Sequence, residues 1–185
     1  MYSLSVPKEN NNTDDFHIEE AIGHLMDQYG NDVLRTSFMY LKDRQRAEDA
    51  FQEVFIKVYN KYKDFRGESS EKTWIIKITI NVCKDILRSS WLKRVITTDR
   101  IASHRGGSDV EGSVIKKSEN ELVFNEVLAL PPAFKDVVIL YYYHRYDTAR
   151  ISEILKTKEG TVRSRLHRAR AVLKSKLGGR FDLEE

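Results

Sequence analysis

Residues 149–177 read ARISEILKTKEGTVRSRLHRARAVLKSKL, and this is the most informative segment for the architecture of the chain. Apolar residues recur three and four positions apart on both sides of a short turn, KTKEG, which predicts a helix-turn-helix. On the second helix the inward face is apolar and comprises Val162, Leu166, Ala169, Leu173 and Leu177. The outward arc is polar and basic, and it comprises Arg163, Ser164, His167, Arg168, Arg170 and Lys174. A helix with this arc, and with its Arg-Ser pair near the N-terminal end, is typical of one that enters the DNA major groove.

The charge of the chain is concentrated in two segments. The formal net charge is only +3, but residues 156–180 hold nine Lys or Arg and one acid, Glu159. Residues 72–94 hold six Lys or Arg and one acid, whereas residues 14–32 hold six acids and no Lys or Arg. The two basic segments therefore attract a phosphate backbone, and the early chain repels it. A basic, merely solvated helix is the alternative for the C-terminal segment, which we disfavour because no interspersed acids would form i,i+4 ion pairs.

The first basic segment coincides with a predicted helix over residues 73–88. Isoleucine, valine and leucine occupy most of its circumference at about 100° per residue, which indicates a largely buried helix. A narrow polar stripe remains, at spacings of 3, 4, 3 and 4, and it comprises Trp74, Lys77, Asn81, Lys84 and Arg88. Cations bind phosphates, an amide reaches a base edge and Trp stacks on an unpaired base, so the stripe favours single-stranded DNA. The alternative is a solvated face with a half-buried Trp.

A loop rich in small hydroxylated residues precedes this helix, with the sequence FRGESSEK over residues 65–72. Serine side chains and backbone groups can read a Watson–Crick edge without filling the space beside it. The loop therefore predicts a pocket for an extruded base next to the basic stripe.

Composition sets the broad class of the protein. The chain has 185 residues, of which 41% are hydrophobic and 32% charged, as in a soluble globular protein. It has no run of about 18 apolar residues and no signal-peptide pattern, so we expect a cytoplasmic location. The single cysteine, Cys83, excludes an internal disulfide and is expected in the core, and the five histidines lack metal-ligand spacing. Paired carboxylates, a phosphate-binding glycine loop and a nucleophile with an adjacent base are all missing, so we expect no enzyme, metal, cofactor or small-molecule substrate.

The predicted fold class is all-α, with two small helical domains joined by a flexible linker and the helix-turn-helix in the C-terminal domain. Helical periods run through residues 15–90 and 119–178. Between them, residues 91–118 are polar and contain glycine, as in RGGSD, which indicates a linker. Pro131-Pro132 interrupts the second block, so several short helices are expected there.

Several motifs of the chain resemble those of extracytoplasmic-function sigma factors, group IV of the sigma-70 family. Phe65-Arg66-Gly67-Glu68-Ser69 followed by Thr73-Trp74 and then Asn81 is similar to their promoter-melting segment. Residues 159–170, EGTVRSRLHRAR, resemble their minus-35 recognition helix, and residues 47–55, AEDAFQEVF, resemble the helix that binds the polymerase beta-prime coiled coil. Leu130-Pro131 resembles the start of their C-terminal domain. The motifs occur in the usual order and at the usual separation.

The resemblance implies an alternative sigma factor that binds core RNA polymerase, at the beta-prime clamp coiled coil and the beta flap, and directs promoter-specific initiation. The residues that would face polymerase are Asp49, Gln52 and Glu53. Those that would read and melt minus-10 are Arg66, Glu68, Ser69, Ser70, Lys72, Trp74, Lys77, Asn81, Lys84 and Arg88. Those on the minus-35 element would be Arg163, Ser164, Arg165, His167, Arg168, Arg170 and Lys174, with Arg165 and Arg170 on phosphate.

The resemblance also implies an organisation and a partner. Residues 15–90 would be sigma domain 2, residues 91–118 the linker that threads the polymerase, and residues 119–178 sigma domain 4. Promoter DNA and core polymerase would be joined by an anti-sigma protein, which in this family is often membrane-bound and would hold the factor at the membrane. The alternative that remains is a conventional helix-turn-helix regulator that acts without replacing the sigma subunit, and titration with core polymerase separates the two.

The chain departs from the family pattern at a few positions. Lys156 stands where the family usually has Gly at the end of the first helix of the motif, so we expect a turn of different shape. Arg150 and Ser152 replace a common Glu and Ala, and Glu71-Lys72 occupies a site where an aromatic is frequent, which leaves base preference open. For residues 141–144, YYYH, we expect core packing with a polar rim.

Overall fold

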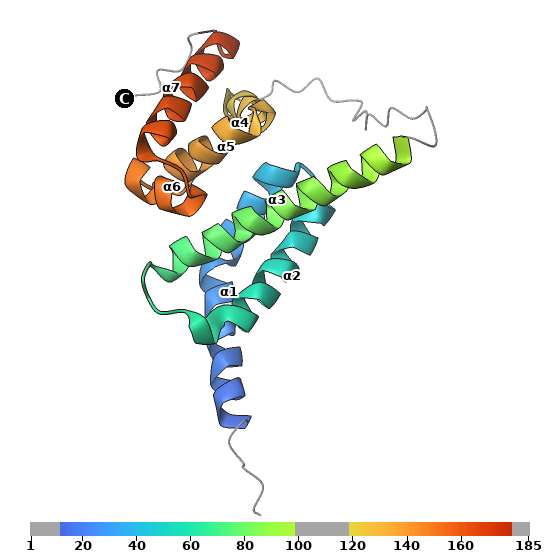
Figure 1. The fold of residues 1–185 in the computed structure, drawn as a ribbon, viewed down its shortest axis with the longest axis vertical. Helices are drawn as coiled ribbons and strands as arrows, with labels where there is room; N and C mark the ends of the chain where they lie inside the picture. The colour runs from blue at the N-terminus through green and yellow to red at the C-terminus, as the bar shows by residue number, and fades with distance from the viewer. Residues whose placement is uncertain (1–11, 99–118, 179–185) are drawn as a thin grey trace, which may run out of the picture. The chain divides into compact units, whose positions relative to one another are not determined.

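The computed structural model describes residues 12–98 and 119–178, and over these ranges the backbone forms helices and their connecting turns (Figure 1). The chain divides into two compact units, with the boundary after Ser89. The predicted all-α fold with two small helical units is therefore confirmed. Of the predicted linker, residues 99–118 lie outside the described residues.

The first unit consists of α1 (Asn12–Leu41), α2 (Arg44–Lys61), a 3-10 turn η1 (Tyr62–Asp64) and, up to Ser89, α3 (Glu71–Thr98). α1 and α2 pack against each other, and Gly30 permits a close approach because a Cβ there would lie 3.3 Å from the Phe51 ring. Asp43 caps α2, since its side chain accepts a hydrogen bond of 2.8 Å from the Arg46 backbone N–H. The core of the unit includes Val33, Ala50, Val54, Val58, Ile75, Ile76, Ile80 and Val82.

Over residues 73–83 helix α3 is largely buried, as its sequence predicts, whereas Leu87 is 36% exposed. Its fully or nearly buried apolar residues are Ile75, Ile76, Ile78, Ile80, Val82 and Cys83, which confirms the core position of the single cysteine. The helix continues to Thr98, ten residues beyond Arg88, where the periodic pattern ends. Residues 89–98 contain neither Gly nor Pro, so no helix-stopping residue ends the helix at Arg88.

The second unit consists of the short helices predicted around the proline pair. They are α4 (Glu119–Ala129), α5 (Pro132–Val138), the π-helical segment η2 (Ile139–Tyr143), α6 (Thr148–Leu155) and α7 (Glu159–Lys176). Pro132 is the first residue of α5. The backbone N–H at this position would make no hydrogen bond within the helix, so proline loses none there. One core cluster of the unit joins Leu130, Val138, Ala169 and Leu173. Val162 and Leu166 are also buried and Leu177 packs against that cluster, so the predicted inward face of α7 is confirmed.

The tyrosine tract lies in the π-helical segment η2, which continues directly from α5. The His144 N–H donates to the Ile139 carbonyl at 3.1 Å, five residues back, as in a π-helix. Tyr142 packs against the core cluster and His144 is buried, so the expected core packing is confirmed. The wider helical turn was not predicted, because an apolar and aromatic run has the same pattern in an α-helix and in a π-helix.

At three helix ends in the described residues a cation takes the left-handed conformation, where glycine is usual. In the described ranges, the non-glycine residues with positive φ are Lys42, Arg145 and Lys156, at 56°, 60° and 50°. After Lys156 the Thr157 N–H donates to the Ser152 carbonyl at 3.0 Å, which is the closure a glycine normally gives. The expectation of a differently shaped turn is therefore wrong, since Lys156 itself takes up the left-handed conformation.

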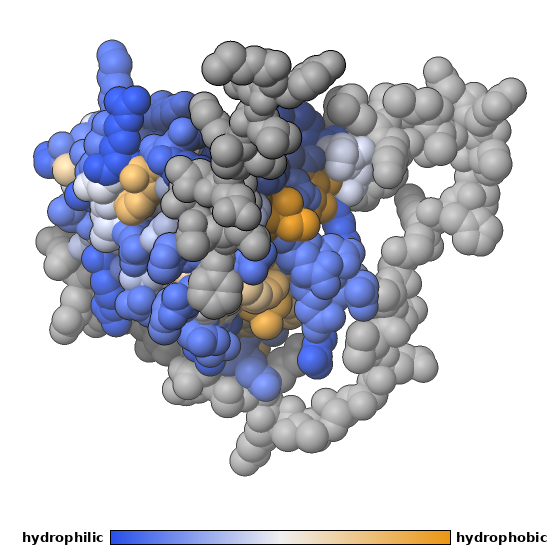
Figure 2. Space-filling view, turned by 90° about the horizontal axis from the view of Figure 1, so that it is seen from below, coloured by the Kyte–Doolittle hydropathy of each residue, from blue (hydrophilic) through white to orange (hydrophobic). Residues whose placement is uncertain are grey.

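Hydrophilic residues dominate the face drawn in Figure 2, where apolar residues appear only in small separate groups. The large hydrophobic side chains that are exposed in the described residues are Met26, Ile56, Tyr59, Leu87, Leu122 and Phe124. Ile56 is the most exposed of them, at 61%. Tyr59 is 39% exposed, whereas the buried residues of α2 are Ala47, Ala50, Val54, Phe55 and Val58.

Candidate nucleic-acid interface

The polar stripe of α3 lies on the side of the helix that the core leaves open. Asn81 and Arg88 are exposed, and Trp74, Lys77 and Lys84 are partly buried, while the residues between them are mostly buried. Arg88 also pairs with Asp85 on the same helix at 3.4 Å. The stripe therefore offers an aromatic ring, an amide and three cations along one line of an otherwise apolar helix.

A cavity of about 330 Å³ opens at the start of this stripe. Its lining residues are Asp64, Phe65, Arg66, Glu68, Ser69, Trp74 and Lys77. The Phe65 and Trp74 rings lie 4.7 Å apart at 31°, and together they give the cavity an aromatic wall. The volume is at the lower end of the roughly 300–1,000 Å³ typical of small-ligand pockets, so one planar base can enter. The loop thus forms a pocket, with Arg66, Glu68 and Ser69 of the predicted residues on its lining.

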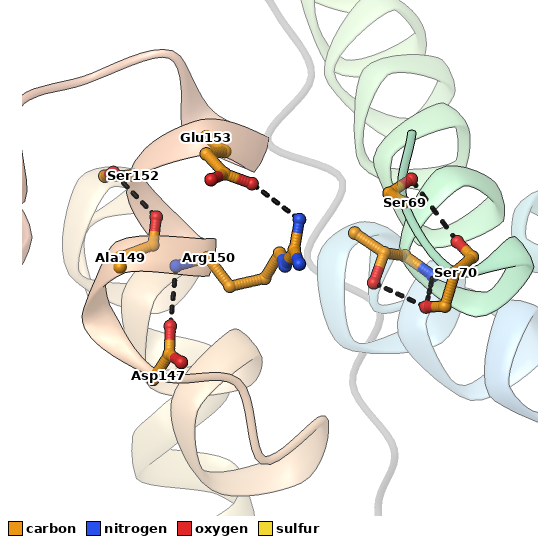
Figure 3. Close-up of polar contacts among 8 residues, drawn as sticks. Ser69, Ser70, Asp147, Ala149, Arg150, Ser152 and Glu153 are labelled. Atoms are coloured by element: carbon orange, nitrogen blue, oxygen red, sulfur yellow. Dashed lines mark hydrogen bonds and ion pairs between the residues drawn. The ribbon is translucent and has the colours of Figure 1, made fainter. Parts of the chain in front are cut away.

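Two residues of the predicted loop, Ser70 and Lys72, stabilise the start of α3 and do not line the cavity. Ser70 begins α3, because its Oγ accepts from the Thr73 N–H at 3.2 Å and its hydroxyl also lies 2.9 Å from the Thr73 hydroxyl (Figure 3). Lys72 lies within the first turn of α3, and its Nζ pairs with Asp32 of α1 at 2.8 Å. Glu71 and Lys72 are therefore helical, which corrects the prediction that the loop extends to residue 72.

The predicted polymerase-facing residues lie on α2. Asp49 and Gln52 are exposed, and Glu53 is partly buried and pairs with Lys57 at 2.8 Å. One and two turns beyond Gln52 the same helix exposes Ile56 and Asn60. The exposure of Ile56 was not predicted, since an apolar residue in an amphipathic helix ordinarily lies in the core.

The basic arc of α7 is exposed over much of its length. Arg163, Ser164, His167, Arg168 and Lys174 are exposed, and Arg165 and Arg170 are partly buried. The Ser164 hydroxyl donates to the Thr161 carbonyl at 3.0 Å. Most of the predicted minus-35 residues therefore share one open face of the helix.

One acid interrupts the arc. The Glu159 Oε1 accepts from Arg163 Nη2 at 2.7 Å and from Thr148 Oγ1 at 2.5 Å. The Thr148 hydrogen bond, and after it that of Arg163, holds the pKa of Glu159 below its ordinary value. The expectation that α7 carries no i,i+4 ion pair is therefore wrong, because Glu159 and Arg163 form one.

Arg170 is held by the tyrosine tract. Its Nε donates to Tyr142 Oη at 2.8 Å, and its guanidinium lies 5.6 Å and 5.8 Å from the Tyr141 and Tyr142 ring centroids. The hydrogen bond to Tyr142 raises the pKa of Arg170 above its ordinary value. The predicted phosphate ligand thus also joins α7 to η2.

Helix α6 precedes α7 and carries its own ion pair (Figure 3). Asp147 caps it by accepting from the Arg150 N–H at 2.7 Å. The Arg150 guanidinium donates to Glu153 at 2.6 Å, so the Arg that departs from the family pattern is partnered within α6. Thr148 and Tyr142 were not predicted, because their partners Glu159 and Arg170 lie on other elements. The pair of Glu159 with Arg163 was missed although its i,i+4 spacing lies within α7.

Two further observations concern metal binding and membrane insertion of the described residues. They hold no group of three or more His, Cys, Asp or Glu side chains that could bind a metal ion. None of the helices in the described ranges is both long and apolar enough to cross a membrane.

Comparison with known proteins gives matches over both units. A family model described as sigma-70 region 2 matches residues 25–94, and one described as sigma-70 region 4 matches residues 122–173. The ECF RNA polymerase sigma-E factor of Haemophilus influenzae is 30% identical over 169 residues, which cover 86% of this chain and 88% of that protein. The ECF RNA polymerase sigma factor SigX of Bacillus subtilis is 29% identical, with 85% and 84% covered.

Solved structures share the fold at low sequence identity. The sigma factor RpoE from Bartonella quintana, in complex with the anti-sigma factor NepR, aligns with a TM-score of 0.71 and 17% identity over 88% of this chain and 99% of that one. CnrH in complex with the cytosolic domain of CnrY aligns with a TM-score of 0.62 and 16% identity, covering 88% and 91%.

Proposed function

Since the chain belongs to the extracytoplasmic-function sigma factors of the sigma-70 family, we propose which of its surfaces performs each step of transcription initiation. The chain is an alternative sigma factor, a regulatory protein that binds core RNA polymerase and directs promoter-specific initiation. The comparisons give no support to a conventional regulator. The assignment of surfaces rests on one observation: two basic helix faces, on α3 and α7, lie in separate units.

We assign minus-10 recognition and melting to the first unit, residues 15–90. The cavity bounded by Phe65 and Trp74 takes an extruded base of the non-template strand, and Arg66, Glu68 and Ser69 supply polar groups to its edge. Lys77, Asn81, Lys84 and Arg88 continue the path along the opened strand, where cations meet phosphates. Ser70 and Lys72 support this site by fixing the start of α3.

We assign minus-35 recognition to the second unit, residues 119–178. Arg163, Ser164, His167 and Arg168 are presented near the N-terminal half of α7, the part of a recognition helix that reaches base edges. Lys174, which is exposed, and Arg165, which is partly buried, are assigned in this proposal to the flanking phosphates. Arg170 contributes charge while it stays bonded to Tyr142.

We assign the main polymerase contact to the exposed face of α2. The Asp49 and Glu53 carboxylates, with Gln52 between them, meet basic groups of the beta-prime coiled coil, and the second unit meets the beta flap. We further propose that an anti-sigma protein, of a kind that is often membrane-bound in this family, holds the factor when it is inactive. A protein of this fold, RpoE from Bartonella quintana, forms a complex with the anti-sigma factor NepR. In this proposal the chain acts in the cytoplasm with no cofactor and no catalytic activity of its own.

A paired gel-shift and run-off experiment tests the proposal. The free protein is expected to bind promoter duplex weakly, because its basic surface is divided between two units, and to direct specific transcription only with core polymerase. Tight sequence-specific binding by the free protein, with no transcription on addition of core, would contradict it.

A further inference from the structure

Glu159 joins the two helices of the helix-turn-helix through a single carboxylate oxygen. Thr148, the first residue of α6, donates its hydroxyl to Glu159 Oε1, and Arg163, one turn into α7, donates Nη2 to the same oxygen. The start of the first helix is therefore tied to a cation on the DNA-facing arc of the second.

This arrangement differs from an ordinary exposed ion pair on a helix. Such a pair links two flexible side chains and is weakened by solvent and salt. Here the Thr148 hydroxyl fixes the carboxylate, which also lies at the positive end of the α7 dipole. The Arg163 side chain remains 70% exposed, against 38% for Glu159, so the guanidinium is oriented and still accessible.

We propose that Glu159 is a positioning residue that sets which base Arg163 reads in the minus-35 element, a role that rests on the proposed function of α7. A guanidinium carries five N–H donors in a planar fork, so one can stay on Glu159 while two others bind O6 and N7 of a guanine. If the Arg163 guanidinium is oriented before DNA binds, it loses less side-chain conformational entropy on binding. It can also reach fewer of the neighbouring bases. Thr148 acts through Glu159 by holding its carboxylate.

The test is run-off transcription by the reconstituted holoenzyme on promoters that carry each of the four bases at each minus-35 position. Arg163→Ala identifies the position that Arg163 reads. At that position Glu159→Ala is expected to shrink the ratio between the best and the worst base by about threefold to tenfold. Thr148→Val should shrink it less, and Thr148→Ser, which keeps the hydroxyl, should restore it.

Two controls separate positioning from charge and from folding. Glu153→Ala removes a carboxylate that is paired with Arg150 within α6, so it should leave every base ratio unchanged. Glu159→Gln keeps the size and one acceptor oxygen, and it should give an intermediate loss of preference with an unchanged melting curve by circular dichroism. In the Arg163→Ala background, Glu159→Ala should change the ratios no further.

The outcomes that overturn the proposal are distinct from those that overturn the function of α7. If Arg163→Ala flattens one base preference and Glu159→Ala alters activity equally on all promoters, Glu159 is only a charge near DNA and the proposal is wrong. If Arg163→Ala changes no preference, both the minus-35 assignment of Arg163 and the role of Glu159 are wrong.

Discussion

The two DNA-facing helices, α3 and α7, expose their polar residues in different ways. α3 buries most of its circumference, so its polar stripe runs along a helix that is part of the core of its unit. α7 buries one face and leaves a wide basic arc. On that arc the second unit holds two of its own cations, as the pairs Glu159 with Arg163 and Tyr142 with Arg170 show.

This difference affects how each helix can be interpreted. On α7, exposure on a helical wheel does not by itself mean that a cation is available, because a partner on another element can orient it. On α3, the polar positions are few and their neighbours are structural, so a defect in DNA opening has to be separated from a defect in folding. Substitutions can test whether the two helices do differ in this way.

The largest effect is expected from a change that prevents association with core polymerase, because neither α3 nor α7 can then act in transcription initiation. Asp49→Arg with Glu53→Arg reverses two charges on the exposed part of α2 and should abolish association with core polymerase, because like charges placed together at an interface cost several kcal/mol. Size-exclusion chromatography with core enzyme measures it. Glu19→Arg with Glu20→Arg, two exposed acids of α1, is the matched control and should bind normally. Undiminished association of the α2 variant would remove that face from the interface.

The next effect is confined to α7. Arg163→Ala or Arg168→Ala should weaken closed-complex formation by roughly 10- to 100-fold and relax preference at one minus-35 base, since a bidentate Arg–guanine contact contributes about 1–3 kcal/mol. Run-off transcription on matched duplex and pre-melted templates is the measurement. A bubble at minus-10 should not restore activity, because the lost contact lies upstream of the opened region.

A somewhat smaller effect is expected on α3. Trp74→Ala or Asn81→Ala should lower activity on duplex templates by about tenfold, the loss of one base-stacking or base-edge contact, and leave minus-35 preference unchanged. A pre-melted bubble at minus-10 should recover most of the activity. Asn81→Ala is the cleaner variant, because Asn81 is exposed whereas Trp74 also packs on Phe65. Rescue of Arg163→Ala by the bubble, without rescue of Asn81→Ala, would mean that the two surfaces are assigned in reverse.

The smallest effect concerns stability alone. Lys156→Gly should stabilise the second unit by about 0.5–1 kcal/mol, because glycine takes the left-handed conformation without the Cβ clash, and its gain is partly offset by the entropy of the unfolded chain. Urea unfolding measures it. Lys156→Ala removes the charge and keeps the Cβ, so it should give no such gain. Equal stability of the Gly and wild-type proteins would show that the strain at Lys156 is no larger than the entropic cost of glycine.

Much of the fold follows from the sequence because helical periods and proline positions are local signals. The inward face of α7 from Val162 to Leu173 and the buried character of α3 both depend on spacing along one helix, and both are confirmed. The end of α3 was misplaced, because a helix without apolar period persists where no Gly or Pro stops it. The left-handed Lys156 was also unexpected, since the rest of the turn can impose a conformation that the residue itself disfavours.

Only those parts of the candidate site that lie on a single helix could be predicted from the sequence. The stripe from Trp74 to Arg88 and the arc from Arg163 to Lys174 each follow from the spacing of residues along one helix. The pocket wall formed by Phe65 on Trp74, the salt bridge from Lys72 to Asp32 and the bond from Thr148 to Glu159 link separate elements. Such contacts depend on packing geometry, which residue spacing does not contain.

The π-helical segment Ile139–Tyr143 has a consequence for chain length. The hydrogen bond of a π-helix joins residues five apart, whereas that of an α-helix joins residues four apart. The segment therefore amounts to a one-residue insertion within a continuous helix. The widened turn lets two consecutive tyrosines, Tyr141 and Tyr142, approach one guanidinium. Deleting a single residue here would convert the segment to an α-helix and rotate everything after it relative to α5. A relative without this extra residue would therefore need a different partner for the residue that corresponds to Arg170.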